Sequence, residues 1–468
     1  MNTRRCRYRT LVLLLLAAVT AGPLRGQSPD EFQKRRQAIR EAMDPGSLLV
    51  LRSGAPAAES AFRQESNLYY LTGIHEPGVS LLLFSARRDT TTGEGPSTGR
   101  PTGGGMIGGR LEALFVPPAA PDFPAPGGTT TLPKAPPSRP GFTNVRPASD
   151  FQQAYDTALL TTTGTVYVDL PRARNLSTPL SADEQWFKAA RDRGAAFTVK
   201  AAAPLFGALR LIKSADEIAL LKSAAEITAA ATREAMRSAK PGMFEYQIQS
   251  IIEHVFTFNG ASRPGFSTIV GSGKNSCILH WSENTRKTEP GDVVVLDIGA
   301  EYNRYTADIT RTIPISGTFT PRQRDIYEIV LKANEEAVKL VGPGVNMAVI
   351  NARVSEILAE GLIRVGLIKD KGGLRQYYTH GLSHSIGLDV HDLGGGLTTG
   401  ILKPGMVITI EPGLYIPAEN LGVRIEDDVI VTPTGYEVIT AAAPKSVGEV
   451  EKAMTEAGMN PARYTVRK

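Results

Sequence analysis

The sequence predicts an α/β domain followed by an α+β domain that is built from two related halves. Three observations lead to this prediction. The chain has 468 residues, enough for two or three domains. Short apolar runs and helical patterns are interleaved in residues 27–207, as in α/β domains. Beyond them, a pattern of two helices and two strands occurs twice, and each first strand ends at an acid.

The first 26 residues have the pattern of a secretory signal peptide, so we expect an exported protein, periplasmic or extracellular. Arginines at positions 4, 5, 7 and 9 precede an apolar run at 11–19. A membrane-spanning helix needs ~20 apolar residues, so this run is too short. We therefore expect no stable membrane span after the leader is cleaved; an uncleaved anchor is the alternative.

The positive net charge belongs to this leader. The whole chain carries 52 basic and 47 acidic residues, and residues 1–26 contain five arginines and no acid. The remainder therefore carries 47 basic and 47 acidic residues. A neutral mature chain gives no support to nucleic-acid binding, and we expect no nucleic-acid partner.

Residues 27–207 are expected to form the α/β domain. Strand-like apolar runs occur at 47–51, 79–84, 111–116 and 165–170, and helical patterns occur at 32–43, 151–160 and 182–191. Two stretches, near 89–110 and 117–147, are rich in Gly, Pro and Thr. Such stretches cannot bury enough apolar surface to order themselves. We interpret them as surface insertions that flank one strand.

Residues 208–468 contain the repeat. Helical patterns occur at 215–239, 244–259, 321–341 and 347–365. The segments PGDVVVLD at 290–297 and PGMVITIE at 404–411 each place an acid six residues after a glycine, at the end of an apolar strand. A returning strand carries a second acid in each copy, Asp308 or Glu426. The repeat predicts a pseudo-twofold domain in which acids from both halves meet.

The spacing of these acids indicates a cation site. A hairpin turn at 302–303 would place Asp297 and Asp308 directly opposite each other, ~5 Å apart. Two such buried charges repel each other and lose solvation, and a bound cation removes both costs. Arg424 lies two residues before Glu426, so their side chains should share a face. The alternatives are an exposed acid in the first hairpin and a simple Arg–Glu surface pair in the second.

Histidines are scarce and clustered. The chain has six, and three of them, His380, His384 and His391, fall within the twelve residues from 380 to 391. Each one alone could be an ordinary core histidine. Together with Gly381 and Gly387, where the backbone can approach closely, they indicate a tight site.

These motifs resemble those of Xaa-Pro aminopeptidases (aminopeptidase P) and prolidases, the proline-directed pita-bread metallopeptidases. Within residues 209–450 the matching segments are ILHWSEN, VVVLDIGAEYNRYTADITRT, HGLSHSIGLDVHD, ITIEPGLYI and GVRIEDDVIV, in the family's order. An early segment, FRQESNLYYLTGIHEPG, resembles the family's N-terminal domain. The resemblance implies an aminopeptidase-P-like domain at 27–207 and a pita-bread catalytic domain at 208–468. It also implies peptide substrates with proline at the second position.

The resemblance further implies a two-metal centre. Its ligands would be Asp297, Asp308, His384, Glu411 and Glu426. Asp297 would hold one ion, His384 and Glu411 the other, and Asp308 and Glu426 would bridge them. Four carboxylates balance the charge of two divalent ions. Oxygen-rich ligands with one imidazole favour manganese, with zinc or cobalt as alternatives.

The catalytic roles that the resemblance implies fall on five residues. A hydroxide shared by the two ions would attack the carbonyl before proline. Glu411 would take its proton and pass it to the leaving nitrogen. His280, His380 and His391 would bind the substrate and stabilise the tetrahedral intermediate. Arg424 would join His280 and His391 in substrate binding.

The sequence leaves two further roles open, one for Arg424 and one for Trp281. Arg424 would also orient Glu426. Trp281, next to His280, could line an apolar slot for the proline ring, although a core position is favoured for it. Trp281 stands where relatives commonly have tyrosine. The relatives' tryptophan-and-glycine segment after the third strand of the N-terminal domain is not recognisable. This second departure leaves the preferred substrate length open.

Other functions remain as alternatives. A prolidase would act on Xaa-Pro dipeptides with the same ligands. A non-catalytic peptide-binding scaffold on this fold would be expected to lose ligands, and here all five are present. The family often forms homodimers or homotetramers, although the sequence has no interface signal. GSGKNS at 271–276 lacks the spacing of a phosphate-binding loop and is interpreted as a turn that leads into the site.

Overall fold

A computed structural model describes residues 27–53, 62–85, 111–118, 139, 141–169, 181–392 and 400–459. The predicted signal peptide and the predicted insertion near 89–110 lie outside the described residues. Of the predicted insertion at 117–147, the described residues are 117–118, 139 and 141–147, and the last three of them form a strand.

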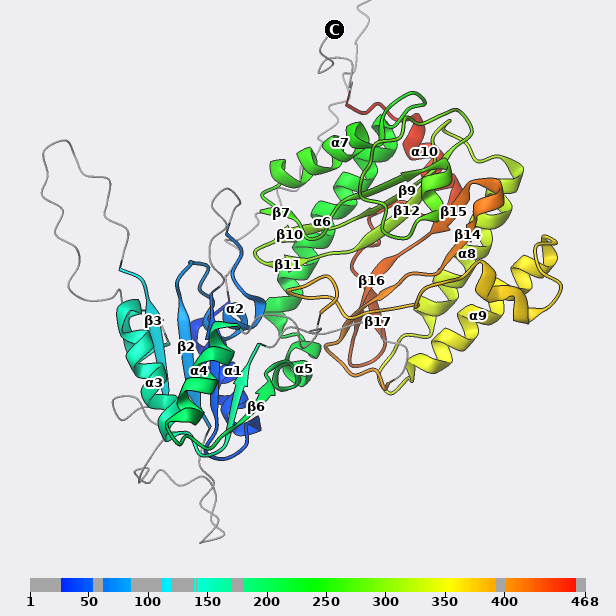
Figure 1. The fold of residues 1–468 in the computed structure, drawn as a ribbon. Coiled ribbons are helices and arrows are strands. Elements are labelled where there is room, and N and C mark those ends of the chain that lie inside the picture. The colour runs from blue at the N-terminus through cyan, green and yellow to red at the C-terminus, as the bar shows by residue number, and fades with distance from the viewer. Residues whose placement is uncertain are drawn as a thin grey trace, which may run out of the picture.

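A six-stranded mixed sheet forms the centre of the N-terminal part, and helices lie against it (Figure 1). Its strand order is β4-β3-β2-β1-β5-β6. The strands are β1 (Leu48–Arg52), β2 (Ser80–Phe84), β3 (Glu112–Val116), β4 (Val145–Pro147), β5 (Thr165–Val168) and β6 (Thr198–Ala201). The helices are α1 (Pro29–Ala42), α2 (Ser66–Thr72), the 3₁₀ turn η1 (Ala148–Asp150), α3 (Phe151–Thr161) and α4 (Ala182–Asp192).

The central strand β1 explains why its sequence is apolar without alternation. Leu49 and Leu51 pack into one hydrophobic cluster, whereas Leu48 and Val50 pack into another. Successive side chains of a strand point to opposite faces, so both faces of this sheet are covered. A continuous apolar run is therefore what this position in the sheet requires.

The helix α5 (Ala203–Leu211) joins the N-terminal part to the rest of the chain. One hydrophobic cluster continues across this junction, because Leu49 and Phe206 belong to the same cluster as Tyr305 and Ile386. The two parts of the chain therefore share a packed interface.

The C-terminal part carries long helices over short antiparallel strands (Figure 1). The helices are α6 (Ala215–Ser238), α7 (Glu245–Phe258), α8 (Pro321–Lys339), α9 (Met347–Arg364) and α10 (Val447–Thr455), with 3₁₀ turns η2 (Gly273–Cys277), η3 (Lys371–Gln376) and η4 (Pro417–Glu419). The strands are β7 (Arg263–Pro264), β8 (Ile269–Ser272), β9 (Val293–Ile298), β10 (Ala300–Tyr302), β11 (Tyr305–Thr306), β12 (Ile309–Pro314), β13 (Val407–Ile410), β14 (Gly413–Ile416), β15 (Leu421–Arg424), β16 (Asp427–Val431) and β17 (Tyr436–Val438).

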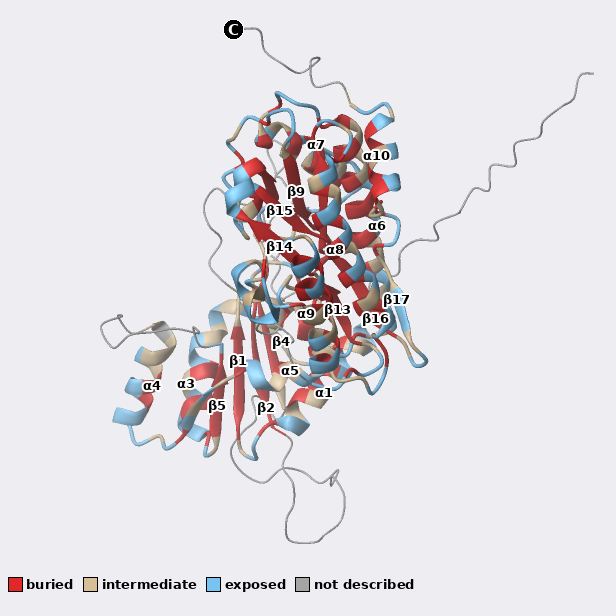
Figure 2. Ribbon diagram, turned by 90° about the vertical axis from the view of Figure 1, so that its right-hand side faces the viewer, coloured by how far each residue is buried: buried red, intermediate tan, exposed pale blue. Residues whose placement is uncertain are grey.

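Local sequence fixes where the leading helix of each half begins. Ser214 accepts from the backbone N–H of Glu217, whose side chain bonds back to the cap, and Thr320 and Gln323 form the same reciprocal cap. These caps satisfy N–H groups that a helix start leaves without partners. Figure 2 shows the strands of this part as buried ribbons behind helices that turn their exposed faces outward.

The predicted repeat is present as two halves. The order of elements in the first half is α6, α7, β8, β9 and β12, with β9 at the centre of the sheet β12-β9-β8. The second half has α8 and α9, then β13 paired with β16 in the sheet β13-β16-β17. The predicted fold class, an α/β domain plus a pita-bread domain with an internal repeat, is confirmed. Among the described residues, no helix is long and apolar enough to cross a membrane.

The predicted pairing of Asp297 with Asp308 is wrong by two residues. Asp297 lies opposite Thr310, because the hairpin turns at Asn303 and Arg304 and not one residue earlier. Both turn residues have positive φ, 45° and 78°, the left-handed conformation that tight two-residue turns require. Side chains alternate with a period of two, so the slip leaves Asp308 on the same face as Asp297.

Candidate metal centre

All nine side chains that the resemblance assigned to the metal ligands or to catalysis line one cavity of about 270 Å³. They are Asp297, Asp308, His384, Glu411, Glu426, His280, His380, His391 and Arg424, and Leu279, Gly381 and Ser383 complete the lining. A neighbouring hollow of about 260 Å³ shares four of them, Asp297, Asp308, His280 and His391. A larger hollow of about 560 Å³ contains none of the nine, so chemistry and not size selects the site.

Each half supplies two carboxylates from strand ends. Asp297 is the penultimate residue of β9, and Asp308 immediately precedes β12. Glu411 directly follows β13, and Glu426 directly precedes β16. The pairing of β13 with β16 and of β14 with β15 places Glu411 directly opposite Glu426. In the first half, by contrast, Asp297 and Asp308 are offset by two residues.

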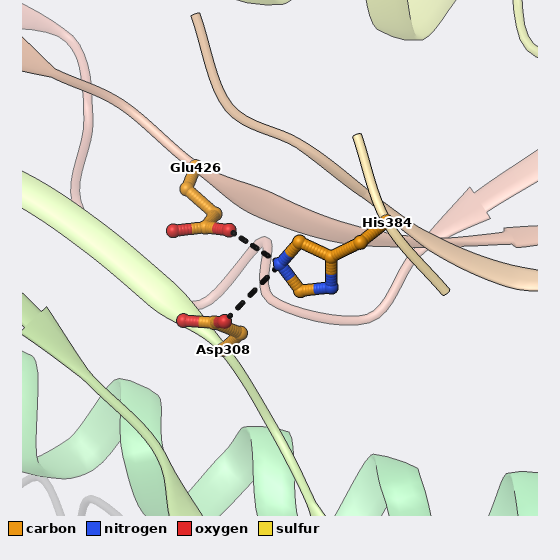
Figure 3. A group of neighbouring side chains, drawn as sticks. All are labelled: Asp308, His384 and Glu426. Atoms are coloured by element: carbon orange, nitrogen blue, oxygen red, sulfur yellow. Dashed lines mark ion pairs between the residues drawn. The ribbon is translucent and has the colours of Figure 1, made fainter. Parts of the chain in front are cut away.

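His384 lies among three of these acids, two of which, Asp308 and Glu426, are drawn beside it in Figure 3. Its Nε2 is 3.4 Å from Glu411 Oε1, 3.6 Å from Asp308 Oδ2 and 3.8 Å from Glu426 Oε1. These separations are longer than hydrogen bonds. The backbone of His384 is held against β13 by Thr409, which accepts from its N–H and donates to its carbonyl. The imidazole nitrogen and the carboxylates thus surround a common point without bonding each other.

Two carboxylate oxygens of this cluster are left without partners. Asp297 Oδ1 and Asp308 Oδ1 are buried and accept no hydrogen bond from the described residues. A buried charged oxygen without a partner costs folding free energy, so native proteins rarely leave one. Asp308, His384 and Glu426 bring their ligand atoms within 4.8 Å of one another. The donor set therefore fits a divalent cation.

Electrostatics in the metal-free site agree with this reading. Burial, and then the neighbouring acids, raises the pKa values of Asp308 and Glu426 well above their usual range. Burial raises the pKa of Glu411 to about 8. Burial lowers the pKa of His384 to about 4, which keeps its imidazole neutral and able to coordinate. A cation bound among these acids would stabilise their ionised forms and so lower their pKa values.

Arg424 pairs with Asp297, and not with Glu426 as the sequence suggested. Its Nη2 donates to Asp297 Oδ2 at 2.6 Å. Its Nε donates to Thr310 Oγ1 at 3.1 Å, and that hydroxyl donates to Glu426 Oε2 at 2.6 Å. The predicted orientation of Glu426 by Arg424 is therefore indirect and runs through Thr310. The surface-pair alternative is wrong, because Arg424 is buried.

Tyr415 is a site residue that the sequence did not reveal. Its hydroxyl accepts from Arg424 Nη1 at 2.8 Å and lies 2.9 Å from His380 Nε2. His380 Nδ1 lies 2.8 Å from the carbonyl of Gly381, so Nδ1 carries the proton and Nε2 accepts from the tyrosine. Burial lowers the pKa of His380 to about 4, which agrees with a neutral ring. The ITIEPGLYI motif contained this tyrosine, but only the pairing of β14 with β15 brings it to Arg424.

The loop that carries His280 is organised by one buried carboxylate, Glu245. It accepts hydrogen bonds from Ser272 N and Oγ, Asn275 Nδ2, Trp281 Nε1 and Arg286 N, at 2.7–3.0 Å. Trp281 thereby bonds to Glu245, and it lines neither hollow at the site. The idea that it forms a slot for proline receives no support.

Replacing Glu245 by glutamine is expected to destabilise the protein by about 2 kcal/mol, because the amide group cannot accept the bonds made to one of the two oxygens. Urea unfolding of the two proteins measures this difference. Glu253→Gln, a half-buried carboxylate on the same helix, is the matched control and should change the unfolding free energy by less than about 0.5 kcal/mol. Equal effects of the two substitutions would contradict the organising role.

Comparison with known proteins decides the family. Residues 219–433 match metallopeptidase family M24, and residues 32–167 match the N-terminal domain of aminopeptidase P. An Xaa-Pro aminopeptidase of Escherichia coli is 37% identical over 455 residues, which cover 92% of this chain and 98% of the relative. The chain belongs to metallopeptidase family M24. The resemblance to aminopeptidase P that its motifs predicted is confirmed, as is a metal-dependent exopeptidase.

Two further comparisons show how far the similarity extends. The structure of Escherichia coli aminopeptidase P with the inhibitor Pro-Leu superposes with a TM-score of 0.76 at 34% identity, covering 94% of this chain and all of the other. An Xaa-Pro dipeptidase of Pyrococcus furiosus is 39% identical over 234 residues, but these cover only 50% of this chain and 64% of the relative. The metallopeptidase thus resembles aminopeptidase P over both of its parts.

Proposed function

We propose that this chain is an exported Xaa-Pro aminopeptidase that uses two divalent metal ions to hydrolyse the bond between an N-terminal residue and a following proline. The observation that carries the proposal is the group of four carboxylates and His384 that lines one cavity, in which two buried carboxylate oxygens have no partner among the described residues. Similarity to the Escherichia coli aminopeptidase over nearly its full length supports the substrate class.

The proposed ligands divide between two ions. Asp297 would hold one ion, His384 and Glu411 the other, and Asp308 and Glu426 would lie between them. Four carboxylates balance two divalent charges, and the oxygen-rich donor set favours manganese, with zinc or cobalt as alternatives. Bound divalent ions polarise the scissile carbonyl and make water acidic enough to attack at neutral pH.

The other side chains of the cavity would bind and orient the peptide. His280 and His391 line both hollows and would contact the bound peptide. His380, fixed by Tyr415, presents a neutral imidazole near Glu411 Oε2, at 3.6 Å. Glu411 would take a proton at this oxygen and give it to the proline nitrogen. Arg424 holds Asp297 and would contact the polar groups of the substrate.

Proline at the second position gives a substrate whose scissile amide has no N–H. None of the proposed roles requires that N–H, so a tertiary amide can be accepted. The N-terminal part of the chain favours an aminopeptidase over a prolidase, because its residues 32–167 match the N-terminal domain of aminopeptidase P and the alignment with the Escherichia coli relative covers 98% of that relative. Export is proposed from the leader pattern at 1–26 alone.

The test compares hydrolysis of Ala-Pro-Ala-Ala with hydrolysis of Ala-Pro, by the protein loaded with manganese and by a Glu411→Gln variant. We expect cleavage of the tetrapeptide, weak or absent cleavage of the dipeptide, and loss of both in the variant. Preference for the dipeptide would make the protein a prolidase. Absence of metal-dependent cleavage would favour a non-catalytic peptide-binding scaffold.

A further inference from the structure

His391 is flanked in sequence by two aspartates that share one guanidinium. Asp389 lies two residues before it and Asp392 one residue after it. Arg210 Nη2 donates to Asp389 Oδ2 at 2.8 Å and also to Asp392 Oδ1. Arg210 lies on α5, the helix that joins the two parts of the chain, and only 3% of it is exposed. One buried guanidinium therefore binds a carboxylate on each side of His391.

The N-terminal part adds contacts to the same segment. Arg63 Nη2 donates to the carbonyl of Leu388 at 2.7 Å, and Ser66 Oγ donates to Asp389 Oδ1 at 2.8 Å. Arg210 Nη1 in turn donates to Asn67 Oδ1 at 2.8 Å. Because Ser66 and Asn67 begin α2, the N-terminal part and α5 together hold the segment 388–392.

Two hydrogen bonds between Asp392 and Ser385 also hold the two ends of this loop together. The N–H of Asp392 donates to the carbonyl of Ser385 at 2.9 Å, and Ser385 Oγ donates to the carbonyl of Asp392 at 2.6 Å. A Cβ at Gly387 would lie 2.6 Å from Asp392 Oδ2, so only glycine leaves room for this carboxylate. The loop is thus shaped around the side chain that Arg210 binds.

Nothing comparable holds the ring of His391. Its imidazole packs edge-on against that of His384, with ring centroids 4.4 Å apart, and makes no hydrogen bond to any described residue. Its position in the cavity therefore depends on the backbone that carries it. A displacement of ~1 Å at a substrate-binding group can change rates by up to ~10²-fold.

We propose that Arg210 is a positioning residue that acts through His391: by binding Asp389 and Asp392 it fixes the segment that presents His391 to the peptide. This inference rests on the proposed function, because it concerns how the peptide is held. It assigns a part in substrate binding to the junction between the two parts of the chain, outside the cavity itself.

The experiment is a double-mutant cycle in the full-length, metal-loaded protein. Arg210→Met, Arg210→Lys and Asp389→Asn are each made in the wild-type background and in a His391→Ala background. The values of kcat and KM for Ala-Pro-Ala-Ala, the affinity for the dipeptide Pro-Leu and the metal content are measured for each. Arg36→Met is the matched control, since Arg36 is equally buried and binds Glu112 and the carbonyl of Leu71 within the N-terminal part.

We expect Arg210→Met to lower kcat/KM by about 10–100-fold in the wild-type background but by less than about twofold once His391 is absent. Pro-Leu should bind more weakly while the metal content is unchanged. Arg210→Lys should recover part of the loss, because lysine keeps the charge but lacks the planar fork. Asp389→Asn, at a partly exposed position, should give a smaller loss with the same dependence on His391, and it carries the test if Arg210→Met does not fold.

Equal losses in both backgrounds would overturn the proposal, because Arg210 would then act through the general fold, as would losses matched by Arg36→Met. Unchanged kinetics in Arg210→Met would overturn it too. A wild-type protein that cleaves no proline peptide would instead refute the proposed function, so the two failures are distinguishable.

Discussion

Replacing Asp308 by asparagine is expected to remove peptide hydrolysis while making the metal-free protein more stable. The carboxylate is buried beside Glu426 and Asp297, and Oδ1 has no partner among the described residues. Loss of this ligand should cost ~4 kcal/mol of transition-state stabilisation, or roughly 10³-fold in kcat/KM. Without metal, the neutral amide relieves repulsion and desolvation, and the unfolding free energy should rise by about 1–3 kcal/mol.

Kinetics with manganese and urea unfolding in a chelator measure these two opposite effects on one variant. Asp325→Asn on α8, an exposed carboxylate, is the matched control and should change neither quantity. A variant that keeps activity within tenfold of the wild type would show that Asp308 is not a ligand. A variant that loses activity and also stability in the chelator would show that Asp308 supports the fold in some other way.

The elements of this chain were predictable because their signals are local. The apolar run of β9 ends at Asp297, and that of β13 ends just before Glu411, as the repeat indicated. The helices predicted at 215–239 and 321–341 begin at Ala215 and Pro321, directly after the caps Ser214 and Thr320. Strand ends that carry acids, repeated twice, were enough to bring four carboxylates into one site.

The register of the first hairpin was not predictable from these signals. A turn at Asn303 and Arg304 needs positive φ at both residues, and arginine rarely takes that conformation. Tyr302 and Asn303 were the more ordinary turn residues, which shifted the predicted pairing by two. The prediction that Asp297 and Asp308 share a face of the sheet was still correct, because a shift of two residues leaves a side chain on the same face.

The contacts that hold the site in place were invisible for a different reason. Glu245 is 36 residues from Trp281, and Arg210 is 179 residues from Asp389. Hydrogen bonds over such separations depend on how helices and domains pack, and no periodicity in the sequence encodes them. The sequence thus predicted the residues that line the cavity and missed those that position them.

The stability of the metal-free protein is expected to fall as the pH rises from about 6.5 to 8 and beyond. Burial and neighbouring acids raise the pKa values of Asp308 and Glu426 well above normal, and that of Glu411 to about 8. The folded state then binds more protons than the unfolded state, whose carboxyl pKa values are ~4, so this stability is present at low pH and lost as the pH rises through the folded values. Glu411 alone should account for about 2 kcal/mol over this window, at ~1.4 kcal/mol per pH unit.

His380 and His384 act in the opposite direction, but at lower pH. Their pKa values, lowered to about 4, contribute stability that is present above the unfolded value of ~6.5 and lost as the pH falls toward 4. Above pH 6.5 the effect of the carboxyl groups therefore remains.

Divalent ions displace the protons that the folded state binds at Asp308, Glu411 and Glu426. The added stability of the metal-loaded protein, ~2.7 kcal/mol at a hundred times the dissociation constant, should therefore grow with pH. Urea unfolding at pH 6.5, 7.5 and 8.5, with chelator or with manganese, measures both slopes, and Glu411→Gln should flatten the slope in chelator. Stability in chelator that stays level or rises over this range would show that the acids are not forced together in the metal-free fold, and would remove the electrostatic basis for the metal centre.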